Sequence, residues 1–159
     1  LEPRVTELTV GHLDTMLEKA RSGETVDYVN QFAGKLPMDV ISELMGVPQA
    51  DRDQVRAWAD GVMHRDEGVN DVPAAAVEAS INLIVYYQAM VAERRKQLTD
   101  DLTSALLEAE IDGDRLTDDE ILGFMFLMVI AGNETTTKLL ANAAFWGPPH
   151  PHQLIPRSH

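Results

Sequence analysis

The segment Thr117–Trp146, TDDEILGFMFLMVIAGNETTTKLLANAAFW, decides the fold class of this chain. Thr117 and Glu120 have the spacing of a capping box, in which a hydroxyl and a carboxylate reciprocally satisfy the exposed N–H groups of a first helical turn. Gly147 and the two prolines after it cannot continue a helix. The segment therefore predicts one long α-helix, about 44 Å from end to end at 1.5 Å per residue.

Outward from this segment, apolar residues recur at helical rather than alternating spacing. This spacing predicts helices at about 3–22, 36–45, 51–63, 74–98 and 102–110, with a turn at 112–114. The helix 74–98 is defined by a pattern that we expect to mark one face: Val77, Ile81, Ile84, Val85, Gln88, Val91 and Ala92. The chain is predicted to be all-α, with one domain at 1–146 and a divergent tail at 147–159.

Composition excludes several classes of function. The 159 residues carry a net charge of −13, which repels nucleic acids and anionic membranes. The chain contains no cysteine, so disulfides, iron–sulfur ligation and thiolate chemistry are excluded. We see no signal-peptide pattern, and the apolar stretch 121–132 is shorter than the roughly 20 residues that span a bilayer. We expect a cytoplasmic protein that binds neither nucleic acid nor membrane.

Polar residues in the middle of the long helix suggest a chemical role. Leu127, Ala131 and Thr135 lie four residues apart and share a face, with Ile130 and Glu134 beside them. The small residues Ala131 and Gly132 would let a flat ligand approach the backbone. An acid and an alcohol at 134 and 135 are the groups needed to move protons from solvent to a buried reaction centre.

Each of these interpretations has a structural alternative. Glu134 has the i,i+4 spacing for an ion pair with Lys138. Leu127 and Ile130 have the character of ordinary packing residues. The three histidines of the tail could bind a metal, but they lack a cysteine or carboxylate partner, and we predict no metal site there.

The six residues Ala131-Gly-Asn-Glu-Thr-Thr136 resemble the oxygen-activating helix of the cytochrome P450 monooxygenases, whose pattern is Ala/Gly-Gly-x-Asp/Glu-Thr-Thr/Ser. Two further segments match the family in the same order. Leu36-Pro-x-x-Val-Ile-x-x-Leu-Met-Gly-Val-Pro48 resembles the segment before the helices that cover the substrate channel, and residues 101–121 resemble the approach to the oxygen-activating helix. The chain is thus similar to the centre of a soluble bacterial P450.

The resemblance implies a role for each matching residue. Ala131 and Gly132 would pack against the haem, and Glu134 and Thr135 would relay protons to the oxygen site. Leu127 and Ile130 would face the substrate. The segments 51–63 and 74–98 would be the helices that cover the substrate channel, joined by a loop at 65–73.

The departures from the family pattern limit what the chain can do alone. The axial cysteine and the Glu-x-x-Arg pair that follow this helix in the family have no counterpart here. We expect a partial P450 fold that does not bind haem stably. Its parent would be a monooxygenase that inserts one oxygen atom into a small lipophilic substrate, with electrons from a ferredoxin or flavoprotein. The alternative is a catalytically empty helical binding module, or a truncated or frame-shifted remnant.

Stability follows from the same long helix. The residues from Ile121 to Ala131 are apolar on every face, which is typical of a central helix covered on all sides. Without the rest of the family fold, we expect exposed apolar surface along Phe124, Leu127 and Met128, and a chain that aggregates or is only partly ordered.

Overall fold

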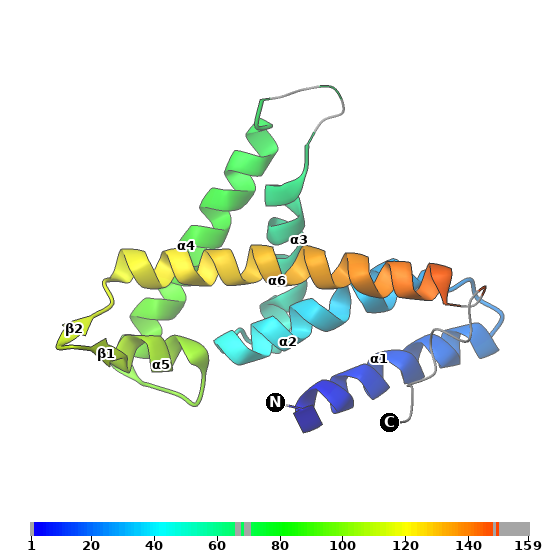
Figure 1. Ribbon diagram of the computed structural model, residues 1–159, viewed down its shortest axis with the longest axis horizontal. Helices are drawn as coiled ribbons and strands as arrows, with labels where there is room; N and C mark the ends of the chain where they lie inside the picture. Colours follow the sequence, from blue (N-terminus) through cyan, green and yellow to red (C-terminus); the bar gives the residue numbers. More distant parts are fainter. Residues whose placement is uncertain (1, 66–67, 69–70, 148, 150–159) are drawn as a thin grey trace. The chain divides into compact units, whose positions relative to one another are not determined.

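A computed structural model describes all residues except 1, 66–67, 69–70, 148 and 150–159 (Figure 1). Within these ranges the regular elements are helices apart from one short hairpin. The α-helices are α1 (Glu2–Arg21), α2 (Lys35–Met45), α3 (Arg52–Met63), α4 (Ala74–Lys96), α5 (Leu102–Glu108) and α6 (Asp118–Trp146). A π-helix (Val29–Ala33) precedes α2, and a 3-10 helix (Gln49–Asp51) precedes α3. The all-α prediction is confirmed.

The predicted helices are all present, with ends that differ by a few residues. The sequence did not predict the antiparallel strands β1 (Glu110–Ile111) and β2 (Asp114–Arg115), because two-residue strands show no periodicity. Their connection is the predicted turn, in which Asp112 and Gly113 have positive φ angles of 55° and 92°.

The chain forms two compact units. One unit contains residues 1–37 and 133–159, and the other contains residues 38–132. The predicted domain at 1–146 and the tail at 147–159 stay predictions, since most of the tail, with two of its histidines in 150–152 and the last at 159, lies outside the described residues.

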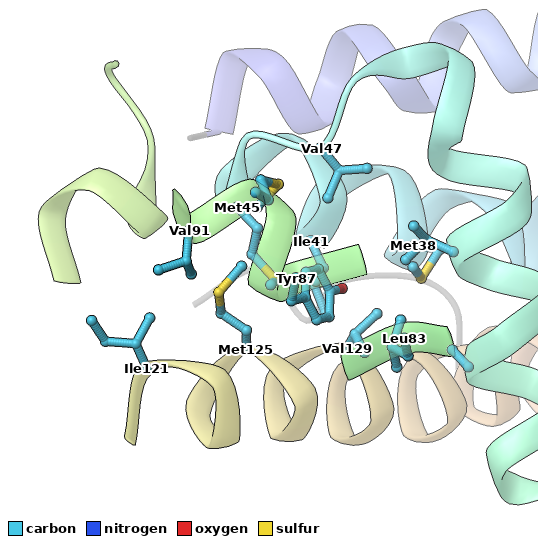
Figure 2. Packing of buried hydrophobic residues seen from close by; sticks show 13 residues of the cluster. Met38, Ile41, Met45, Val47, Leu83, Tyr87, Val91, Ile121, Met125 and Val129 are labelled. Atoms are coloured by element: carbon cyan, nitrogen blue, oxygen red, sulfur yellow. The ribbon is translucent and has the colours of Figure 1, made fainter. Parts of the chain in front are cut away.

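The core of the second unit is built from α2, α3, α4 and the first half of α6 (Figure 2). Its side chains are all apolar apart from one tyrosine hydroxyl: Met38, Ile41, Met45, Val47, Val55, Ala59, Leu83, Tyr87, Met90, Val91, Ile121, Met125 and Val129. Four of these thirteen are methionines, whose flexible side chains fill irregular gaps between crossing helices. The core therefore holds the first half of α6 against α2 and α4.

The predicted apolar face of α4 is wrong in most of its positions. Val77, Ile81 and Val85 are about half exposed. The buried residues are Ala76, Ala79, Leu83, Tyr87, Met90 and Val91. Apolar residues occur around most of this helix, so periodicity does not select one face. Small residues at 76 and 79 allow the close packing of α3 on α4, which lie side by side in Figure 1.

By length and composition, α4 could also cross a membrane, the one such helix in the described part of the chain. Its Leu83 and Tyr87 are buried in the core with residues of α2, α3 and α6. This packing is that of a core helix in a folded unit.

A partly buried polar cluster joins the ends of α2 and α4 to the start of α5. We call it the α2–α4–α5 junction and define it as Gly46, Arg94, Asp101 and Thr103. Arg94 Nε donates to Asp101 Oδ2 at 2.6 Å, and its Nη2 donates to the Gly46 carbonyl at 2.9 Å. Thr103 Oγ1 donates to the Met45 carbonyl at 2.7 Å. The junction thus satisfies carbonyls at the end of α2.

The last turn of α4 carries the basic residues Arg94, Arg95 and Lys96, a pattern typical of a solvated helix end, but only part of this cluster is exposed. The Arg94 side chain is 18% exposed and the Asp101 side chain 5%. Arg95 forms an exposed ion pair with Asp118 at the start of α6. The sequence separations of 7 and 23 residues explain why local pattern did not reveal these pairs.

Candidate functional site

The start of α6 has the capping box that the sequence predicts. Thr117 N donates to Glu120 Oε2 at 2.9 Å, and Glu120 N donates to Thr117 Oγ1 at 3.3 Å. The hydrogen bond from Thr117 N, together with one that Thr117 Oγ1 donates to Glu120 Oε2 at 2.8 Å, lowers the pKa of Glu120. The cap sets the first turn of α6 and so determines which face each later residue occupies.

The candidate site lies on α6, whose two sides differ. Ile121, Met125 and Val129 are at most 1% exposed and point into the core (Figure 2). Asn133 continues this side and is 5% exposed. The predicted site stripe of Leu127, Ala131 and Thr135 lies on another side, and all three residues are exposed. The structure thus keeps the predicted stripe together and leaves it open.

Of the three apolar residues of α6 that we expected to be exposed, two are exposed. Phe124 is 39% exposed and Leu127 63%. Met128 is an exception, because it is partly buried against the core. Ile130 is also partly buried against the core. The two predicted substrate-facing residues therefore differ in setting, since only Leu127 is open, and their substrate role stays a prediction.

Glu134 forms the ion pair that was its structural alternative. Lys138 Nζ donates to Glu134 Oε1 at 2.5 Å, with side chains that are 68% and 38% exposed respectively. An exposed i,i+4 pair of this kind stabilises a helix by about 0.3–0.5 kcal/mol. The carboxylate keeps contact with solvent, which a proton relay also requires. Its catalytic role stays a prediction.

Gly132 lies next to Ile41 of α2, a contact that the sequence does not reveal. A Cβ at this position would overlap with Cδ1 of Ile41 and would lie 3.3 Å from its Cγ1. Ile41 is on α2, 91 residues earlier, and is 9% exposed. The room that the missing side chain leaves is thus filled by Ile41. Ala131, one residue earlier, is exposed.

Two further polar groups were missed because their burial depends on the tertiary structure. The hydroxyls of Ser42 and Tyr87 are buried and have no hydrogen-bond partner among the described residues. Burial raises the pKa of Tyr87, so this hydroxyl stays neutral at physiological pH. The neighbouring Tyr86 hydroxyl instead donates to Asp51 Oδ2 at 2.8 Å.

A haem held by a thiolate does not fit the residues of this chain. The small side chain of Ala131 and the open stripe beside it would allow a flat group to approach α6. However, the sequence has no cysteine to ligate the iron. No group of three His, Asp or Glu side chains that could hold a metal occurs in the described ranges. The chain therefore provides no thiolate ligand for a haem iron.

Solved structures with this arrangement of helices are cytochromes P450. The P450 MycG aligns with a TM-score of 0.80 and 33% identity, over 95% of this chain and 37% of its own. Substrate-free CYP109E1 from Bacillus megaterium aligns with a TM-score of 0.78 and 32% identity, over 92% of this chain and 38% of its own. By its fold and its motif, this protein therefore belongs to the class of P450 helical folds.

Sequence comparison agrees with the fold. Cytochrome P450 123 of Mycobacterium tuberculosis is 60% identical over 154 residues, which are 97% of this chain and 37% of the relative. Cytochrome P450 107B1 of Saccharopolyspora erythraea is 37% identical over 97% of this chain. No family model matches the sequence. The chain belongs to the cytochrome P450 family, and it spans about 37% of the length of the Mycobacterium tuberculosis relative.

Proposed function

We propose that this chain supplies the oxygen-activating helix and the substrate-covering helices of a haem-dependent monooxygenase, and that it does not bind haem through a thiolate by itself. The observation that carries the proposal is the open stripe on α6, where Ala131 and Thr135 lie beside Glu134. In this assignment Ala131 allows the haem to approach, Leu127 and Ile130 face the substrate, and Glu134 and Thr135 hold and pass protons.

The chemistry of the side chains supports a proton relay. Glu134 keeps contact with solvent, and Thr135 follows it directly on the helix. A carboxylate that exchanges protons with water and a hydroxyl that can both donate and accept form a short path. When bound, the haem would supply the oxygen chemistry, and the chain's residues would orient groups and deliver protons.

Relatives and the open stripe on α6 support a proposal for the substrate class. CYP109E1 from Bacillus megaterium has been solved in complex with testosterone and with corticosterone. A Pseudonocardia autotrophica relative, 36% identical, is named vitamin D(3) 25-hydroxylase. Leu127 offers an apolar surface of the kind that such molecules contact. We propose a small lipophilic substrate, a ferredoxin or flavoprotein electron donor, and a cytoplasmic location.

A carbon-monoxide difference spectrum tests the claim about haem. The 159-residue chain is supplemented with haem, reduced and exposed to carbon monoxide. We expect no absorbance band of the type given by thiolate-ligated haem, because no residue can provide the ligand. The appearance of that band would contradict the proposal.

A chimera tests the claim about the relay. Residues 1–146 replace the matching segment of CYP109E1, which provides the remaining fold. We expect Glu134→Gln and Thr135→Ala to lower substrate oxidation by about 10²-fold or more while the carbon-monoxide band is unchanged. Thr136→Ala is the matched control, since it removes the neighbouring exposed hydroxyl. Equal activity of all three variants would sink the relay.

One observation favours a second candidate function. The ion pair between Glu134 and Lys138 is enough to explain an acid at this position. The chain would then be a catalytically empty helical module or a remnant. The same chimera separates the two, because an empty module would leave Glu134→Gln as active as Lys138→Ala.

A further inference from the structure

We propose that Gly132 is a packing glycine, which seats α6 on Ile41 of α2 and thereby determines which side of the turn 131–135 stays open. The evidence is steric: a Cβ at Gly132 would overlap with the end of the Ile41 side chain. Both residues belong to the same compact unit. Gly132 is thus a positioning residue, and its consequence for proton transfer rests on the proposed function.

The neighbours of the contact show why Ile41 cannot simply move away. Ile41 is 9% exposed and belongs to the same core cluster as Val129, one turn before Gly132 on α6 (Figure 2). Branching at Cβ leaves Ile few χ1 rotamers in a helix, so Cγ1, 3.3 Å from the new Cβ, is held in place. The terminal methyl group Cδ1 can rotate about χ2, but only into the packed core around it. A larger residue at 132 would push α6 away from α2 or force Ile41 out of its rotamer.

The geometry of a helix connects this contact to the open stripe. Successive residues turn by about 100° about the helix axis, so seating Gly132 and Val129 on the core turns Ala131 away from it, and Thr135, about 60° from Gly132, lies at the edge of the covered side. Ala131 and Thr135 are exposed, and Asn133, beside Gly132, is buried. The glycine therefore acts on the site through α2.

Gly123 is a natural control on the same helix. It lies in α6 as Gly132 does, but a Cβ there would meet nothing within 4 Å. Replacing an exposed helical glycine with alanine favours the helix. We expect Gly123→Ala to raise the midpoint of thermal unfolding by about 2–4 °C and Gly132→Ala to lower it by about 2–10 °C. Ile41→Val removes Cδ1 and should restore part of the loss in Gly132→Ala.

A disulfide test reads the contact directly, with or without a cooperative unfolding transition. The chain has no cysteine, so Ile41→Cys with Gly132→Cys gives one possible bond. The sulfur at 41 would stand near Cγ1, 3.3 Å from the new Cβ. Gly123 lies nine residues before Gly132, about 13.5 Å along the helix, and is too distant for a disulfide. Ile41→Cys with Gly123→Cys is therefore the control pair.

We expect rapid oxidation of the 41/132 pair in dilute protein, measured by mass spectrometry, and free thiols in the 41/123 pair. Failure of the 41/132 pair to oxidise, or equal oxidation of both pairs, would overturn the proposal. So would a Gly132→Ala variant that behaves like Gly123→Ala. In the chimera, Gly132→Ala should also lower substrate oxidation, with recovery on Ile41→Val. The disulfide test uses no haem, so its failure is distinguishable from failure of the proposed function.

Discussion

Two regions of this molecule contain nearly the same set of residue types in opposite settings. The α2–α4–α5 junction has a glycine, a carboxylate, a threonine and a cation, and so does the turn at 132–138 on α6. In the junction, Asp101 is 5% exposed and has Arg94 as its partner. On α6, Glu134 is 38% exposed and pairs with the more exposed Lys138. The comparison teaches that residue type alone does not separate a structural cluster from a candidate site.

Burial of the polar groups separates them instead. Asp101 caps α5 by accepting a hydrogen bond from Ser104 N at 2.8 Å. Thr103 is fully buried, and its hydroxyl donates to the Met45 backbone carbonyl. The junction thus uses its polar atoms inside the protein. The carboxylate of Glu134 and the hydroxyl-bearing residue Thr135 are accessible to water. Groups that must exchange protons or meet a ligand need this accessibility.

The largest expected effect comes from deleting the two carboxylates in turn. Asp101→Ala removes the cap of α5 and leaves Arg94 without a carboxylate, so we expect a loss of about 3 kcal/mol or more in the free energy of unfolding. Glu134→Ala should cost about 0.5 kcal/mol or less. Urea unfolding followed by far-UV circular dichroism measures both. Similar losses for the two variants would break the comparison.

The next largest loss of stability is expected from replacing Gly46 of the junction. Gly46 has a φ of 81°, and a Cβ there would overlap with the Asp101 carboxylate. We expect Gly46→Ala to cost about 2 kcal/mol or more, from backbone strain and displacement of Asp101. Gly113 has a φ of 92° with nothing within 4 Å, so Gly113→Ala measures the strain alone, about 1 kcal/mol. Equal unfolding midpoints in urea would show that the junction tolerates a Cβ.

Acidification should weaken the junction. Burial raises the pKa of Asp101, but hydrogen bonds from Thr99, Ser104 and Arg94 lower it by more, so the pKa lies below its usual value. A lowered pKa gives stability that is present above the unfolded-state value of about 3.9 and is lost as pH falls through the folded-state value. We expect the free energy of unfolding to fall below about pH 4.

The control for this pH dependence is Asp101→Asn, which cannot titrate. It should be less stable than the natural chain at pH 7 and should lose less stability between pH 5 and pH 3 (roughly the range in which carboxylates protonate). Asp27 and Glu120 also have lowered pKa values, from hydrogen bonds with Asn30 and Thr117, so some dependence remains. An unchanged slope in Asp101→Asn would contradict the assignment.

The smallest effect is expected at Lys138. Lys138→Ala removes the i,i+4 pair with Glu134 and should cost about 0.3–0.5 kcal/mol at low salt. At about 1 M salt, where the screening length is only about 3 Å, the difference should vanish. A salt-independent loss above about 1 kcal/mol would mean that the pair does more than stabilise the surface of α6.

Local pattern accounts for most of the fold that was predicted. The capping box at Thr117 and Glu120, the turn at 112–114 and the helix ends follow from residues within a few positions of one another. Pattern failed for α4, where it selected Val77 and Ile81 in place of Leu83 and Tyr87. A helix with apolar residues on several sides gives no sequence signal for which side other helices will bury.

For the candidate site, local pattern predicted which residues share one side of α6. Helical spacing predicts the stripe Leu127, Ala131 and Thr135. The resemblance of its motif to the P450 oxygen-activating helix suggests the roles of these residues, which stay predictions. The contact of Gly132 with Ile41 was not predictable, because 91 residues separate the two and no periodicity links them. The role of Arg94 in the junction was missed for the same reason.

The sequence by itself determined the helices of this protein, the cap that starts α6 and the order of the residues along the stripe. These depend on hydrogen bonds and rotamers within one or two turns. Only the tertiary structure decided which side of α6 is buried, that Ile41 fills the room beside Gly132, and that Asp101 is enclosed while Glu134 is open. Those outcomes depend on packing between helices that are distant in sequence, and packing is not encoded in any single segment.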